Sequence, residues 1–122
     1  MFIQPRQMIR ELGISGKCTI LDIGAGSGYC LLEACKVAGI HSNYIAIDRN
    51  KELLKRLKDT AIIGGYIINT LVQDLENPII IHNYIADYII LTNTLHLIEN
   101  KKQLISECRR LLAPKGLLLF VD

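Results

Sequence analysis

Three glycines and one acidic residue have the spacing of a ligand-binding site. Gly24, Gly26 and Gly28 follow an apolar run at residues 18–23, and Asp48 ends a second apolar run at residues 44–48. Glycines in such a turn adopt positive φ and let the backbone approach a ligand closely. A carboxylate at the end of the next strand can accept hydrogen bonds from both hydroxyls of a ribose. A simple tight turn and a helix cap at Asp48 are the plainer alternatives, but together the residues predict a nucleoside ligand.

Two further residues indicate which nucleoside is bound. Dinucleotide-binding loops have the spacing G-x-G-x-x-G, whereas here Tyr29 occupies the place of the last glycine. Asp22, just before the first glycine, would repel a pyrophosphate in a low-dielectric cleft. S-adenosylmethionine (SAM) has no phosphate, and its ammonium and sulfonium would be attracted to an acid directly or through an ordered water. Unless Asp22 is only a helix cap, these residues favour SAM over NAD.

Apolar runs alternate with helical patterns along the chain. Strands are predicted at residues 18–23, 44–48, 67–72, 86–92 and 117–121. Helices are predicted to begin at Pro5, at Tyr29, after Asn50 and near Asn100, and Pro114-Lys-Gly116 is expected to end the last one. The expected apolar face of that helix consists of Leu104, Ile105, Cys108, Leu111 and Leu112. Residues 79–81 fit a strand, a buried turn or a helix edge and stay unassigned.

This alternation predicts an α/β fold. Strands and helices at this spacing form a Rossmann-like, doubly wound parallel sheet with helices on both faces and right-handed crossovers. Residues 1–122 are expected to form a single domain. Ligands of such sheets bind beyond the carboxyl ends of the strands, where the strand order reverses. The loop at residues 24–28 is therefore expected at the site.

Five segments, in the same order, resemble class I SAM-dependent methyltransferases, and the small-molecule branch in particular. Residues 19–28, TILDIGAGSG, resemble the first motif, residues 44–48 the second and residues 72–74 the third. Residues 86–96 and 107–122 are similar to the fourth and fifth strands with their intervening helix. The resemblance implies a sheet of about five strands in the order 3-2-1-4-5. It also implies that the family's usual last two strands are not included, so that relative to the family the chain is expected to be truncated after the fifth strand.

The resemblance also implies roles for individual residues. Asp74 would receive the adenine amino group, Leu75 would offer its backbone amide to the ring, and Asn93 would line the methionine end of SAM. Arg49 would lie over the adenine, unless it is simply solvated. The alternative for Asn93 is that it only serves the turn and contacts no ligand. The expected cofactor-binding residues are Asp22, Gly24, Gly26, Gly28, Asp48, Arg49, Asp74, Leu75 and Asn93. The catalytic residue is unknown, and His96 is a candidate base with a structural role as its alternative.

Methyl transfer from SAM depends mainly on alignment, because the sulfonium is already an activated leaving group. The sequence therefore predicts a methyltransferase whose acceptor is a small molecule or a group presented by a partner protein. A non-catalytic SAM-binding or regulatory module, or one subunit of a methyltransferase complex, is the alternative that the short chain favours. An NAD-dependent oxidoreductase is disfavoured by Asp22 and Tyr29. Methylation of nucleic-acid bases is a minor option, because residues 92–97 lack the Asn-Pro-Pro-Tyr motif.

Composition excludes several other classes of protein. The net charge of +2 comes from dispersed Lys and Arg, which gives no strong nucleic-acid signal. No apolar stretch is long enough to span a membrane, and the N-terminus does not resemble a secretory signal, so a cytoplasmic protein is expected. The four cysteines lack C-x-x-C spacing and are expected to be buried free thiols. His41 and His82 have no clustered partners, so no metal site is expected.

The last predicted strand has a consequence for assembly. In the order 3-2-1-4-5 it lies at the edge of the sheet, and residues 117–121 are strongly apolar with no proline or lysine among them. A self-complementary contact about a two-fold axis is the commonest way to cover such an edge. The sequence predicts a homodimer through this edge or its flanking helices.

Overall fold

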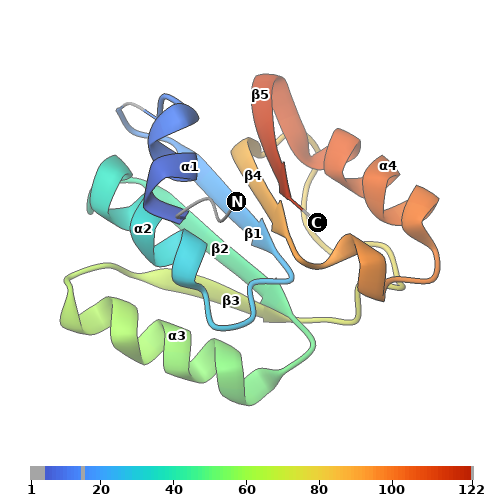
Figure 1. Cartoon of the computed structure of the whole chain (residues 1–122), viewed down its shortest axis with the longest axis horizontal. Helices are drawn as coiled ribbons and strands as arrows, with labels where there is room; N and C mark the ends of the chain where they lie inside the picture. The colour runs from blue at the N-terminus through green and yellow to red at the C-terminus, as the bar shows by residue number, and fades with distance from the viewer. Residues whose placement is uncertain (1–4, 15, 122) are drawn as a thin grey trace.

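A computed structural model describes residues 5–14 and 16–121, which form a five-stranded parallel sheet with the strand order β3-β2-β1-β4-β5 (Figure 1). The strands are β1 (Thr19–Ile23), β2 (Asn43–Asp48), β3 (Ile68–Val72), β4 (Ala86–Thr92) and β5 (Leu112–Val121). The helices are α1 (Pro5–Glu11), α2 (Tyr29–Ala38), α3 (Lys51–Ile63), the 3₁₀-helix η1 (Leu95–Leu97) and α4 (Lys101–Leu111). The predicted fold and strand order are confirmed. The single-domain expectation also covers residues 1–4, 15 and 122, which lie outside the described residues.

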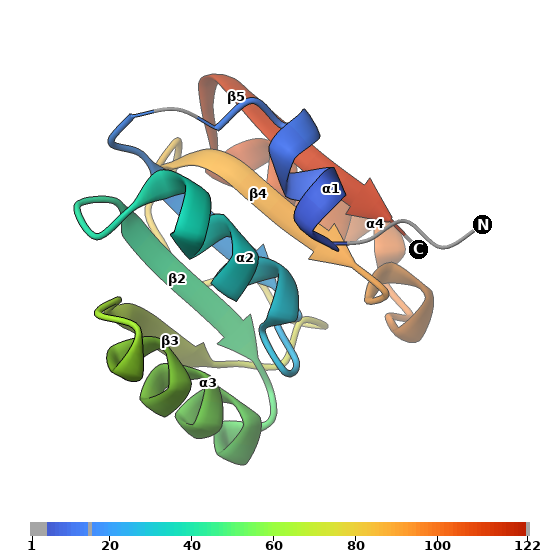
Figure 2. The ribbon, with the colours of Figure 1, turned by 60° about the vertical axis from the view of Figure 1, so that its left-hand side comes forward.

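Two apolar cores lie on opposite faces of the sheet. Because side chains alternate along a strand, Ile20 points to one face and Leu21 to the other, and both are fully buried. Helices α1, α2 and α3 cover the face of Ile20, and α4 covers the face of Leu21. Figure 2 shows α2 in front of the sheet and α4 behind it. Burial on both faces explains the nearly continuous apolar sequences of the central strands β1 and β4, whereas β5 at the edge of the sheet is apolar but partly exposed.

The predicted helix starts at Asn50 and Asn100 are confirmed. The Oδ1 atom of Asn50 accepts the backbone N–H of Leu53 at 3.1 Å, and that of Asn100 accepts the N–H of Gln103 at 3.2 Å. Each side chain thus satisfies one N–H of the first helical turn, as N-cap residues do. Helix α3 begins at Lys51, three residues after Asp48, and its cap residue Asn50 donates its own N–H to Asp48 at the end of β2.

The prediction that Pro114-Lys-Gly116 ends the last helix is wrong. Helix α4 ends at Leu111, and β5 begins at the next residue. Ala86 pairs with Leu112 and Tyr88 pairs with Leu117, so residues 113–116 bulge out of the β4–β5 ladder. A proline is tolerated there because its missing N–H is not needed for pairing. Leu112 therefore belongs to the strand, and Ile105 of the expected helix face is 39% exposed.

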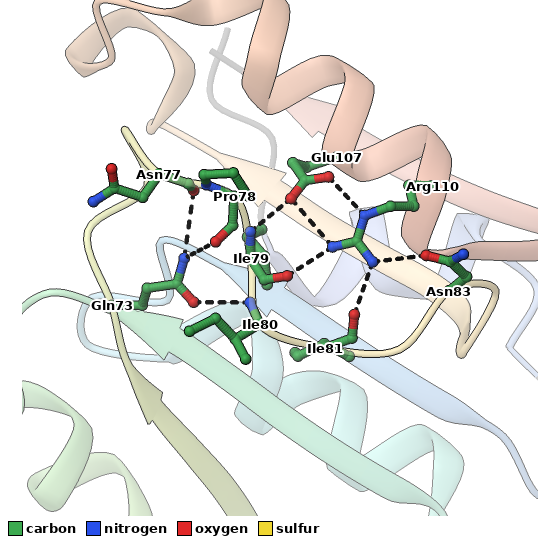
Figure 3. Close-up of polar contacts among 9 residues, drawn as sticks. All are labelled: Gln73, Asn77, Pro78, Ile79, Ile80, Ile81, Asn83, Glu107 and Arg110. Atoms are coloured by element: carbon green, nitrogen blue, oxygen red, sulfur yellow. Dashed lines mark hydrogen bonds and ion pairs between the residues drawn. The ribbon is translucent and has the colours of Figure 1, made fainter.

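The unassigned residues 79–81 form neither helix nor strand and are held by polar contacts from two sides (Figure 3). Glu107 accepts the N–H of Ile79 at 2.6 Å, and Arg110 donates to the carbonyl oxygens of Ile79 and Ile81 at 2.7 and 2.8 Å. On the other side, Gln73 accepts the N–H of Ile80 at 3.1 Å. These contacts satisfy backbone groups that a ladder or helix would otherwise satisfy.

Three of the four cysteines are buried, as expected, but Cys30 is only half-buried. All four are free thiols. Burial raises the pKa of Cys35 to about 12 and that of Cys108 to about 11, so both thiols stay protonated and unreactive at neutral pH. Among the described residues, no helix is long and apolar enough to cross a lipid bilayer.

Candidate cofactor-binding site

A pocket of about 470 Å³ lies beyond the carboxyl ends of β1, β2, β3 and β4. Four consecutive connections form its walls: Gly24 and Gly26 after β1, residues 48–50 and Leu53 after β2, residues 73–76 after β3, and residues 93, 94, 97 and 98 after β4. This is where a doubly wound sheet is expected to bind its ligand. Of the predicted cofactor-binding residues, all except Asp22 and Gly28 line this pocket.

The three glycines of the loop after β1 have positive φ values of 73°, 55° and 73° but face different surroundings. A Cβ on Gly24 would overlap the side chain of Thr94, and one on Gly28 would overlap Leu57 of α3. A Cβ on Gly26 would meet nothing within 4 Å. Gly24 and Gly28 are therefore required by close packing within the protein, whereas Gly26 faces open space.

Asp48 connects this loop to the end of β2. Its Oδ2 accepts the N–H of Gly26 at 2.9 Å, and its Oδ1 accepts the N–H of Asn50 at 2.8 Å. An ionised carboxylate has about four lone-pair positions, so about two remain for further donors. Because Asp48 lines the pocket, those positions are available to two neighbouring hydroxyl groups of a ligand.

Asp22 lies beneath the loop, inside β1, and is 2% exposed. Burial and, to a lesser extent, the negative charge of Asp48 together raise its pKa to about 7. Its carboxyl group is therefore partly protonated at neutral pH. It does not line the pocket wall, so its predicted pairing with a ligand cation stays a prediction.

The wall after β4 is built from Asn93 and Thr94. Asn93 has φ of 51°, a left-handed conformation that asparagine tolerates well, and donates its N–H to the carbonyl oxygen of Val121 at 2.7 Å. Thr94 is buried and donates its hydroxyl to the carbonyl oxygen of Thr92 at 2.8 Å. These contacts fix the chain where it crosses from β4 over Gly24.

The side chains around the pocket suit a cationic nucleoside better than a phosphorylated one. Asp48, Asp74 and Glu76 place three carboxylates on its walls against one cation, Arg49. Leu53 and Leu75 add apolar surface of the kind that packs against a planar base. A pyrophosphate would be repelled by this lining, whereas an ammonium and a sulfonium would be attracted. Among the described residues, no group of three His, Cys, Asp or Glu side chains could hold a metal ion.

A family model described as a methyltransferase domain matches residues 21–120. The chain belongs to this methyltransferase family. The match runs from the middle of β1 to the last residues of β5 and therefore includes all four walls of the pocket. It confirms the resemblance seen in the sequence, and SAM is the cofactor expected of such a methyltransferase domain.

Individual relatives of the methyltransferase domain are larger proteins. Polyketide synthase 8/35 of Dictyostelium discoideum is 38% identical over 84 residues, which are 65% of this chain and 3% of that protein. Ribosomal protein L11 methyltransferase of Photorhabdus laumondii is 30% identical over 87 residues, 66% of this chain and 28% of the relative. A SAM-dependent methyltransferase from Aquifex aeolicus has a similar structure, with a TM-score of 0.79 and 25% identity. The chain covers 58% of that structure, which in turn covers 90% of the chain.

The remaining predicted cofactor-binding residues and the candidate base differ in their exposure and in their distance from the pocket. Arg49, Asp74 and Asn93 are exposed at the pocket, and Leu75 is a buried part of its wall. His96, the candidate base, is exposed on η1 and does not line the pocket.

Sequence reasoning missed seven lining residues: Asn50, Leu53, Gln73, Glu76, Thr94, Leu97 and Ile98. Most of them come from the connections after β3 and β4. The first five of these lie within four residues of the end of a predicted strand or in the first turn of the next helix, which could have indicated them, whereas Leu97 and Ile98 carry no such signal.

Proposed function

We propose that this domain binds SAM in the pocket and transfers its methyl group to an acceptor that enters beside η1. The observation that carries the proposal is the carboxylate of Asp48, which keeps two acceptor positions beside the open face of Gly26. That arrangement fits the vicinal hydroxyls of a ribose. Asp74 and Leu75 would hold the adenine, and Asn93 would line the methionine end.

When bound, SAM supplies an electrophilic methyl group on a positively charged sulfur. The residues of the chain then have to bind, orient and shield the reacting groups, which is the main contribution to such a transfer. The loop at residues 24–28 is fixed for this task, because Gly24 and Ala25 donate their N–H groups to the carbonyl oxygen of Ile47 at 2.8 and 3.0 Å. Leu97 and Ile98 would exclude water from the side of the pocket next to η1.

We propose that the acceptor is a small molecule or a group presented by a partner protein. Two relatives support both options, since one is named as a polyketide synthase and the other as a ribosomal protein L11 methyltransferase. Leu97 is 70% exposed although it lines the pocket, so apolar surface is available beside the opening for an incoming acceptor. The cytoplasmic location expected from the sequence stays a prediction.

We further propose a homodimer through the β5 edge or its flanking helices. Leu117 and Phe120 of β5 are about half exposed, at 49% and 47%. Within the described residues, β5 pairs with β4 alone, so its other edge is available to a second chain. Pro114 and Lys115 lie at the start of β5, where they discourage pairing, so the contact would use the later residues. Light scattering on a gel-filtration peak tests this, and a monomer at tens of micromolar would refute it.

The decisive experiment for the binding site is calorimetric titration with SAM, S-adenosylhomocysteine and NAD. SAM and S-adenosylhomocysteine are expected to bind, and NAD is not. A transfer assay with SAM that carries a labelled methyl group, against small-molecule and protein fractions, then tests catalysis. It also shows whether the acceptor is a small molecule or a protein. Binding without any transfer would favour a regulatory module or one subunit of a complex, and preferential NAD binding would overturn the proposal.

A further inference from the structure

Glu76 joins two walls of the pocket. Its Oε2 accepts the backbone N–H of Glu99 at 3.0 Å, and its Oε1 accepts the N–H of Asn100 at 3.1 Å. Glu76 belongs to the connection after β3, and the two amides lie between η1 and α4 in the connection after β4. One half-buried carboxylate thus bridges segments more than twenty residues apart in the sequence.

The residues next to Glu76 include those that are expected to contact the adenine. Asp74 accepts the N–H of Glu76 at 3.0 Å through its Oδ1, so these two residues share one tight turn. Leu75 between them is buried in the same core as Ile98 and Leu104. A shift of Glu76 would therefore move Asp74 and the backbone amide of Leu75 as well.

The bridge also suits the charge distribution of α4. The first turn of this helix contains no acidic residue and begins with Lys101 and Lys102, although a helix N-terminus favours negative charge. The carboxylate of Glu76 supplies that charge from a distant segment. A glutamine has the same shape, but it has only one oxygen and would turn an N–H₂ group toward a backbone N–H donor.

We infer that Glu76 is a positioning residue, which fixes the adenine side of the SAM site by fastening residues 74–76 to the start of α4. This inference rests on the proposed function, since it assigns a role in binding that cofactor. It predicts that binding at the pocket and the protection of the Glu99 and Asn100 amides are linked, because each favours the same arrangement of residues 74–76.

The test is titration of the parent chain, Glu76→Gln and Glu99→Gln with S-adenosylhomocysteine, with hydrogen exchange at the amides of residues 99 and 100. Glu76→Gln is expected to bind roughly tenfold more weakly, which corresponds to about 1.4 kcal/mol. Glu99→Gln removes one negative charge next to Glu76 but keeps the backbone N–H that Glu76 accepts. Its affinity for S-adenosylhomocysteine should lie within about twofold of that of the parent. The ligand should slow exchange at both amides in the parent and have little effect in Glu76→Gln.

A structural cap alone would lower the melting temperature without changing affinity or the linkage. A folded Glu76→Gln chain that binds as tightly as the parent would therefore overturn the inference while leaving the proposed function intact. If Glu76→Gln does not fold, Glu76→Asp replaces it, because aspartate keeps the charge but is too short to reach both amides. Equal affinity of Glu76→Asp and the parent would overturn the inference in the same way. A parent chain that binds no S-adenosylhomocysteine overturns the proposed function and this inference together.

Discussion

The two sides of the pocket are held in place by different means. The loop after β1 is fixed locally, by glycines and by hydrogen bonds to the adjacent strand β2. The connection between β3 and β4 is fixed at a distance: Glu107 and Arg110 in the second half of α4 hold it from the helix, and its own Glu76 binds backbone N–H groups just before α4 begins. The first side depends on the backbone conformation of a short motif, and the second depends on side chains that only the folded protein brings together.

The largest expected effect concerns Asp48, on the locally fixed side. Asp48→Ala removes the two acceptor positions proposed for the ribose and leaves the N–H of Gly26 without its partner. Affinity for S-adenosylhomocysteine is expected to fall by about 2 to 4 kcal/mol, since hydrogen bonds to a charged group are worth about 1.5 to 3 each and water recovers part of the loss. Calorimetry measures this, and Asp59→Ala on the exposed surface of α3 is the control with the same change of charge. Parental affinity in Asp48→Ala would mean that the ribose is held elsewhere.

The next effect concerns the side held from a distance. Arg110→Ala leaves the carboxylate of Glu107 buried without its ion pair and frees the carbonyl oxygens of Ile79 and Ile81. The free energy of unfolding is expected to fall by about 3 kcal/mol, the lower end for a buried pair, because the guanidinium is partly exposed. Urea denaturation measures it. Arg109→Ala, one residue along on the exposed face, should change stability by less than about 0.5 kcal/mol.

Part of this contrast was visible in the sequence and part was not. The glycine loop and Asp48 lie in short motifs, so their place at the ends of β1 and β2 could be predicted without knowing the rest of the fold. The bridging roles of Glu76 and Thr94 could not be recognised, because the residues that they connect to across the pocket are at least 23 positions away in the sequence. Ligand contact by Gly28 stays a prediction, and the structure adds a requirement that the sequence did not reveal, since a Cβ at this position would overlap Leu57.

A smaller effect separates two glycines of the same loop. Gly28→Ala places a methyl group against Leu57 at φ of 73°, whereas Gly26→Ala places it in open space at φ of 55°. Both variants adopt an unfavourable backbone conformation at a cost of about 1 to 2 kcal/mol, but Gly28→Ala also overpacks the core. Thermal unfolding is expected to show Gly28→Ala about 2 kcal/mol less stable than Gly26→Ala. Relative to its loss in unfolding free energy, Gly26→Ala should lose more affinity for S-adenosylhomocysteine than Gly28→Ala does. The reverse ranking would contradict the conclusion that Gly28 is needed for packing and Gly26 faces the ligand.

The smallest effect is a dependence on pH through Asp22. Its pKa is raised in the folded protein, so the folded state binds a proton more tightly, and its contribution to stability is lost as the pH rises from about 4 through about 7. If its charge attracts the cofactor, SAM affinity should rise by about threefold to tenfold between pH 6 and pH 8, because a difference of 1.4 kcal/mol is tenfold. Asp22→Asn should bind SAM equally at both pH values. The same slope in Asp22→Asn and the parent would assign the pH dependence to another group.

The bulge at residues 113–116 limits what can cover the outer edge of β5. Regular pairing with β4 resumes at Leu117 and continues to Val121, so within the described residues five positions present an even row of backbone donors and acceptors on the other side. At about 3.3 Å per residue, that row is roughly 17 Å long. A strand added there, from a second copy or from any other chain, would match an ordinary short strand in length and would begin level with Tyr88 of β4.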